Sequence, residues 1–113
     1  MAPGTGTETR QTYLVEHYRP GVPAEGLRRG AAQIRAAVDE LEREGLAVRY
    51  LNATIVPADE SFLCVLESAS EELVREAYTR AGIAFERISL VIPEEREPGA
   101  VAPSAGQRRK DDE

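Results

Sequence analysis

Tryptophan is absent from this 113-residue chain, and histidine and cysteine occur once each. A single cysteine cannot form an internal disulfide bond, which agrees with a reducing compartment. A single histidine excludes two-histidine metal motifs such as HExxH, and the sequence contains no CxxC pair. A serine hydrolase is not indicated either, because no GxSxG turn occurs. The sequence therefore contains no recognisable set of catalytic residues.

Long apolar runs and an excess of basic residues are also missing. No apolar run approaches the roughly 20 residues of a membrane-spanning helix, and the first ten residues lack the apolar stretch of a signal peptide. Acidic residues outnumber basic ones by 20 to 14, which gives a formal net charge of −6. Neither nucleic acid nor membrane is therefore an expected partner, and a cytoplasmic location is the expectation.

Both ends of the chain are poor in large aliphatic residues. Residues 1–11 are small and polar, and residues 93–113 combine three prolines with a mixed-charge ending. Such segments cannot bury enough apolar surface to offset chain entropy, so both are predicted to be disordered. One folded domain is predicted over residues 12–92, and its small size favours association with a second copy.

Two helices and four strands are predicted within this domain. Apolar residues spaced by four and three positions from Leu27 to Leu41 indicate a helix that starts at Pro23 or Ala24 and ends at Glu44. A second helix begins at a cap on Ser68 or Ser70 and ends before Gly82. The predicted strands cover residues 12–18, 47–56, 62–67 and 87–92.

This order, with a hairpin between the second and third strands, indicates an α+β fold of the ferredoxin-like βαββαβ type. Right-handed crossovers then place both helices on one face of a four-stranded antiparallel sheet. The other face would be too apolar to stay wet if it carried either of two sets of residues: Tyr13, Val15 and His17, or Phe62, Cys64 and Leu66. Pairing of two such faces predicts a homodimer in the form of a dimeric α+β barrel.

Five residues are candidates for a functional site. His17 is the candidate metal ligand, with carboxylates or Cys64 supplied by other strands or by a partner chain; alternatively it makes local hydrogen bonds at a strand end. Cys64 is either a small core residue or part of a pocket. Tyr50 and Asn52 are expected to share a strand face, where the Asn52 amide either satisfies a backbone group or lines a cavity. Tyr13 completes the candidate pocket-lining set, and no catalytic residue is predicted.

Several segments resemble a bacterial family of unknown function whose small ferredoxin-like members include nickel-binding proteins. They are YLVEH (13–17), the RY pair (49–50), residues 62–82 with the pattern Phe-x-Cys-x-x-Glu, and ERISLVI (86–92). The resemblance implies a homodimeric barrel and, in some members, nickel held by histidines and carboxylates. His17 matches a histidine of the metal-binding members, whereas Ala77 and Ala81 stand where those members have histidines. Because imidazole suits nickel, the implied metal site is weakened or lost in this chain.

Three functions follow as hypotheses. The first is a non-catalytic dimeric protein with weak or lost binding of a divalent metal or small ligand. The second is an enzyme similar to the cofactor-free monooxygenases built on the same dimeric barrel, in which Asn52, Tyr50 and His17 would serve. The third is a regulatory or protein-interaction module.

Overall fold

The computed structural model of the chain describes residues 9–94. The elements in chain order are β1 (Gln11–Tyr18), α1 (Ala24–Arg43), β2 (Val48–Val56), the 3-10 turn η1 (Pro57–Asp59), β3 (Ser61–Ser68), α2 (Glu71–Ala81) and β4 (Arg87–Val91). The predicted βαββαβ order is confirmed, with boundaries that differ by one or two residues. Most of the two segments predicted to be disordered, residues 1–8 and 95–113, lies outside the described residues.

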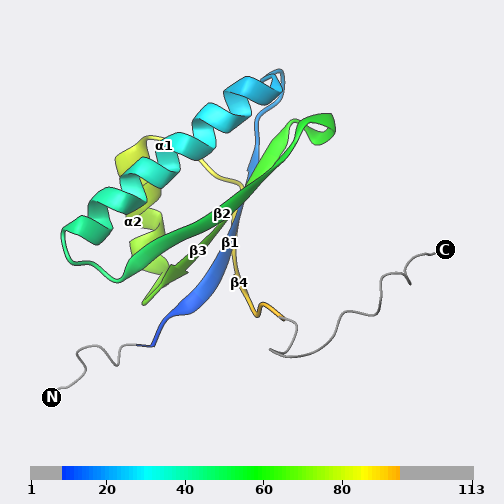
Figure 1. The fold of residues 1–113 in the computed structure, drawn as a ribbon. Helices are drawn as coiled ribbons and strands as arrows, with labels where there is room; N and C mark the ends of the chain where they lie inside the picture. Colours follow the sequence, from blue (N-terminus) through cyan, green and yellow to red (C-terminus); the bar gives the residue numbers. More distant parts are fainter. Residues whose placement is uncertain (1–8, 95–113) are drawn as a thin grey trace, which may run out of the picture.

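The four strands form one antiparallel sheet in the order β2-β3-β1-β4. Both helices lie on the same side of this sheet, as Figure 1 shows. This arrangement is the ferredoxin-like one that the order of elements predicted. Neither helix within residues 9–94 has the length and apolarity needed to cross a membrane.

The helix-covered face of the sheet carries the core. Alternate residues of the two central strands are buried there, namely Tyr13, Val15 and His17 on β1 and Phe62, Cys64 and Leu66 on β3. Neither set therefore lies on the open face, so the condition under which that face would be too apolar to stay wet is not met by these residues. The apolar stripe of α1, which includes the fully buried Ile34 and Val38, needs an apolar partner and covers these strands.

The open face of the sheet combines an apolar centre with charged flanks. Leu14 lies opposite Val65 in the register of β1 and β3, and Leu63 is the next residue on the same side of β3. All three are only half-buried. On the β4 side, Arg87 donates to a Glu16 carboxylate oxygen at 3.0 Å.

A β-bulge in the edge strand β2 changes the expected placement of Asn52. Tyr50 pairs with Leu66, on the helix side, whereas Asn52 pairs with Val65, on the open side, because the register shifts between them. The expectation that Tyr50 and Asn52 share a strand face is therefore wrong. One extra residue, Leu51, breaks the alternation of period two on which that expectation rested.

The helix ends follow the predicted signals. Ser70, not Ser68, is the cap of α2, because its hydroxyl oxygen accepts from the Leu73 backbone N–H at 3.2 Å. Ser68 instead donates to the Ser70 carbonyl oxygen at 2.7 Å. Gly82 ends α2 with a φ of 71°, in the left-handed region that glycine adopts without strain.

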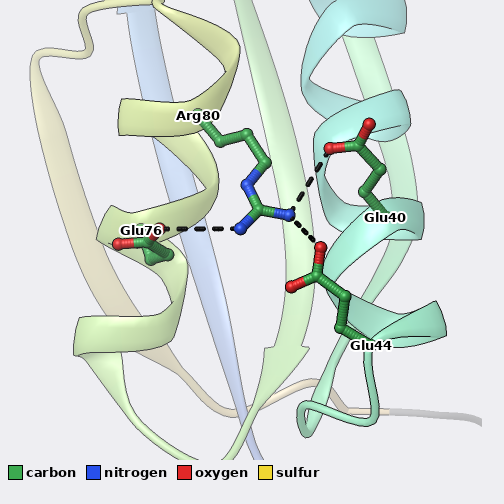
Figure 2. A network of polar contacts seen from close by, with 4 residues as sticks. All are labelled: Glu40, Glu44, Glu76 and Arg80. Carbon is green, nitrogen blue, oxygen red and sulfur yellow. Dashed lines mark hydrogen bonds and ion pairs between the residues drawn. The ribbon is translucent and has the colours of Figure 1, made fainter.

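An arginine on α2 connects the two helices. Arg80 donates to Glu40 of α1 at 3.4 Å and to Glu44, the residue that caps the C-terminal end of α1, at 2.6 Å, and its other terminal nitrogen lies 4.0 Å from Glu76 on its own helix (Figure 2). These groups face solvent, where ion pairs contribute little to stability. They link the C-terminal end of α2 to that of α1 across the surface of the protein.

Candidate functional site

His17 lies in a closed apolar environment between the sheet and α2. Its residue is only 1% exposed. The imidazole stacks on the ring of Phe62 with centroids 4.0 Å apart and an interplanar angle of 7°. Tyr78 of α2 lies on the other side, with ring centroids 5.2 Å apart. The only histidine of the chain is therefore part of the core.

Both ring nitrogens of His17 have protein partners. Nδ1 lies 2.9 Å from the Phe62 carbonyl oxygen, and Nε2 lies 2.9 Å from the Tyr78 hydroxyl. A carbonyl oxygen can only accept, so Nδ1 carries the proton and Nε2 accepts from Tyr78. Burial lowers the pKa of His17, the hydrogen bond to Phe62 partly opposes that shift, and the nearby charge of Arg19 adds to it. The ring is therefore neutral at neutral pH.

Cys64 lies close to two tyrosines but is not activated as a nucleophile. The Tyr50 hydroxyl lies 3.8 Å from its sulfur. Burial raises the pKa of the Cys64 thiol, and hydrogen bonds with Tyr78 and Tyr50 only partly oppose the shift. Burial also raises the pKa values of both tyrosines. All three groups therefore stay protonated at neutral pH, and none is a strong nucleophile or base.

The described residues do not fit a nickel ion within one protomer. A ligating imidazole must offer a free nitrogen lone pair, whereas Nε2 of His17 already accepts a hydrogen bond. Within residues 9–94, no group of three or more histidine, cysteine, aspartate or glutamate side chains is close enough to hold a metal ion. Metal ligation by His17 stays a prediction, and it requires displacement of the Tyr78 hydroxyl.

Two of the four candidate pocket residues line one cavity. Tyr50 and Asn52 contribute to a cavity of about 540 Å³ between α1 and the edge strand β2. Tyr13 and Cys64 do not line it, and they are buried in the core at 6% and 0% exposure. His17 is absent from its lining as well. The structure thus separates the candidate residues into a buried cluster and an open pocket.

Three residues of the buried cluster and the cavity were not predicted from the sequence: Tyr78 in the cluster, and Arg28 and Arg35 in the cavity. Tyr78 follows Val74 by four positions, so it lies on the buried face of α2, where its hydroxyl needs a polar partner. Arg28 and Arg35 line the cavity from α1. Their spacing of seven residues is two helical turns, which was the available signal that they share a face.

Comparison with known proteins gives a family and a fold. The sequence model of the family described as "Nickel responsive protein SCO4226-like" matches residues 13–91. The crystal structure of SCO4226 from Streptomyces coelicolor A3(2) is similar, with a TM-score of 0.59 and 22% sequence identity. The match covers 74% of this chain and 99% of that one, and at this identity it supports the fold alone. No curated protein matches the chain.

Proposed function

Because the chain belongs to the nickel responsive protein SCO4226-like family, we propose that it is a homodimeric, non-catalytic binding protein whose affinity for nickel is weak or lost. The match over residues 13–91 covers nearly the whole predicted domain, and the predicted resemblance is confirmed. The family supplies the class of protein. The side chains of this chain supply the reason to expect weak binding.

The occupied nitrogens of His17 carry the proposal. A nickel ion that used Nε2 would have to displace the Tyr78 hydroxyl and leave it without a partner in the core. An unsatisfied buried hydroxyl costs about 1–3 kcal/mol, which would be subtracted from the binding free energy. The positions that hold histidines in the metal-binding members resembled by this chain are Ala77 and Ala81, and alanine offers no ligand atom.

Two observations support a non-catalytic role over a monooxygenase-like enzyme. Tyr50 and Asn52 line one cavity, but His17, the third residue of the enzyme hypothesis, does not reach it. Among the residues that line the cavity, Tyr50 is the one whose side chain could act as a base on losing its proton, and burial holds its hydroxyl protonated.

The open face of the sheet supports the homodimer. Leu14, Leu63 and Val65 form an apolar centre that no helix covers. Glu16 and Arg87 flank it on one side. An apolar centre with a charged rim is typical of a protein interface, and a second copy would bury it against an identical surface. Association of two small domains also compensates for the limited core of each.

Isothermal titration of the tag-free protein with nickel, zinc and copper tests the proposal. We expect weak heats of binding that are equal in the wild type and in His17→Gln, because surface carboxylates rather than the imidazole would bind. Because His17→Gln could fail to fold, Tyr78→Phe serves as a second variant. It keeps the His17 imidazole and removes the hydroxyl that occupies its Nε2. Tight stoichiometric binding that disappears in His17→Gln, with Tyr78→Phe folded and binding more tightly, would overturn the proposal.

A further inference from the structure

The open cavity between α1 and β2 is lined by positively charged residues and by no negatively charged one. Its residues are Arg28, Ala31, Ala32, Arg35, Tyr50, Leu51, Asn52, Ala53 and Ile55. Two arginines and no acidic residue occur among them, on a chain whose net charge is −6. We propose that this cavity binds a small organic anion, in which a carboxylate group is attached to a compact apolar body.

The two guanidinium groups have little internal neutralisation. Arg28 makes no ion pair within residues 9–94, and Arg35 reaches only Asp39, at the long distance of 3.9 Å. By contrast, Arg80 and Arg87 each have a carboxylate within 3.0 Å. A carboxylate ligand would therefore complete a charge pairing that the protein leaves open, and the fork of an arginine suits its geometry.

The rest of the cavity supplies a place for an apolar body. Ala31, Ala53 and Ile55 are buried or half-buried apolar residues of its lining. The ring of Tyr50 is half-buried, and its hydroxyl points toward the Cys64 sulfur, which leaves ring carbon atoms for contact with a ligand. A volume of about 540 Å³ lies in the usual range for small-molecule sites.

The edge strand shapes the opening of the cavity. β2 is the last strand on its side of the sheet, and the bulge between Tyr50 and Asn52 leaves Leu51 without a cross-strand partner in the register. Bulges are frequent at sheet edges and beside binding sites, where they re-aim side chains. Here Tyr50 and Ala53, on the two sides of the bulge, both pair with buried residues of β3 on the helix side, Leu66 and Cys64, and both line the cavity.

This inference deepens the binding role under the proposed function, because it names the class of ligand. It does not depend on nickel or on the dimer. Titrations with nickel can therefore contradict the proposed function while the cavity still binds an anion. Equally, the cavity can fail to bind an anion while the nickel titrations support the proposed function.

The test is an NMR titration of the full ¹⁵N-labelled chain with three probes. Sodium benzoate carries the charge and an apolar body, benzamide has the same shape without the charge, and sodium acetate has the charge alone. We expect saturable shifts with benzoate that map to residues 28–35 and 50–55, and much weaker shifts with benzamide and acetate. Each of Arg28→Gln and Arg35→Gln should weaken benzoate binding by about fivefold, the scale of an exposed charge pair.

Arg43→Gln is the matched control, because Arg43 is an exposed arginine of the same helix outside the cavity. It should leave benzoate binding unchanged. The proposal is overturned if benzoate causes no saturable shifts, if benzamide binds as well as benzoate, or if Arg43→Gln weakens binding as much as the two cavity variants do.

Discussion

Tyr78 on α2 donates its hydroxyl proton to Nε2 of His17 on β1 across 2.9 Å, although the two residues are 61 positions apart in the sequence. Nδ1 of the same ring is occupied by the Phe62 carbonyl oxygen. The two hydrogen bonds fix the tautomer of the imidazole and hold α2 against the sheet. Histidine is a common metal ligand, but both nitrogens of this imidazole are hydrogen-bonded within the core.

Removal of the Tyr78 hydroxyl should destabilise the protein. Tyr78→Phe leaves Nε2 of His17 as a buried acceptor without a donor, which costs about 1–3 kcal/mol of unfolding free energy. Urea denaturation measures this change. Tyr18→Phe is the control, because Tyr18 is 53% exposed and its hydroxyl can bond to water. Equal denaturation midpoints for the two variants would show that the buried hydrogen bond contributes nothing.

Stability should fall as the solution is acidified through the histidine range. The pKa of His17 is lowered in the folded state from its ordinary value of 6.5, so the unfolded chain binds the proton more readily. The stabilisation is fully present above pH 6.5 and is lost progressively as the pH falls toward the folded-state pKa. Urea denaturation between pH 7.5 and pH 5 measures the slope.

His17→Gln is the control for this pH dependence, since His17 is the one histidine of the chain. The slope between pH 7.5 and pH 5 should largely disappear in that variant. Persistence of the full slope would assign it to other groups.

A charge in the centre of the open face should separate the proposed dimer. Val65→Lys places an ammonium group between Leu14 and the rest of the apolar centre, where a second copy would bury it without a partner. Sedimentation should then give the 12.4 kDa mass of one chain, whereas the wild type gives twice that mass. Ala36→Lys, on the exposed side of α1, should remain dimeric. A wild type that sediments as a single chain contradicts the dimer directly.

Gly30 is required for close packing of α1 on the sheet. An added Cβ would lie 3.1 Å from Cζ and 3.3 Å from Cε1 of Phe62, a fully buried ring stacked on His17. Gly30→Ala should therefore lower stability, although alanine in a helix normally gains up to about 1 kcal/mol over glycine. Ala36→Gly at an exposed site of the same helix calibrates that propensity difference. A Gly30→Ala variant more stable than the wild type would mean that Phe62 moves aside easily.

The order of elements could be predicted because its signals are local. The apolar stripe from Leu27 to Leu41, the stop at Gly45 and the break at Pro57 each depend on neighbouring residues, and the structure follows them. The burial of Cys64 as a small core residue was among the open alternatives and is what the structure shows.

The details of the candidate site could not be predicted, because they depend on contacts between elements rather than on the residues of any one strand. Nothing in the segment from Val48 to Val56 signals a bulge, so the alternation of period two predicts one shared face for Tyr50 and Asn52, which the bulge instead separates. The choice of face for β1 and β3 depends on which side the helices cover, and the partnership of His17 with Tyr78 depends on how α2 docks. These are properties of the packed fold, in which residues distant in sequence meet.

The most direct test of a structural role for His17 is a long-range ¹H–¹⁵N spectrum of its imidazole at pH 7.5, with and without an equimolar amount of nickel. We expect one neutral ring with the proton on Nδ1, as the hydrogen bond to the Phe62 carbonyl oxygen requires, and signals that survive the addition of nickel. A ring protonated on Nε2, or selective loss of the His17 signals when nickel is added, would contradict that role.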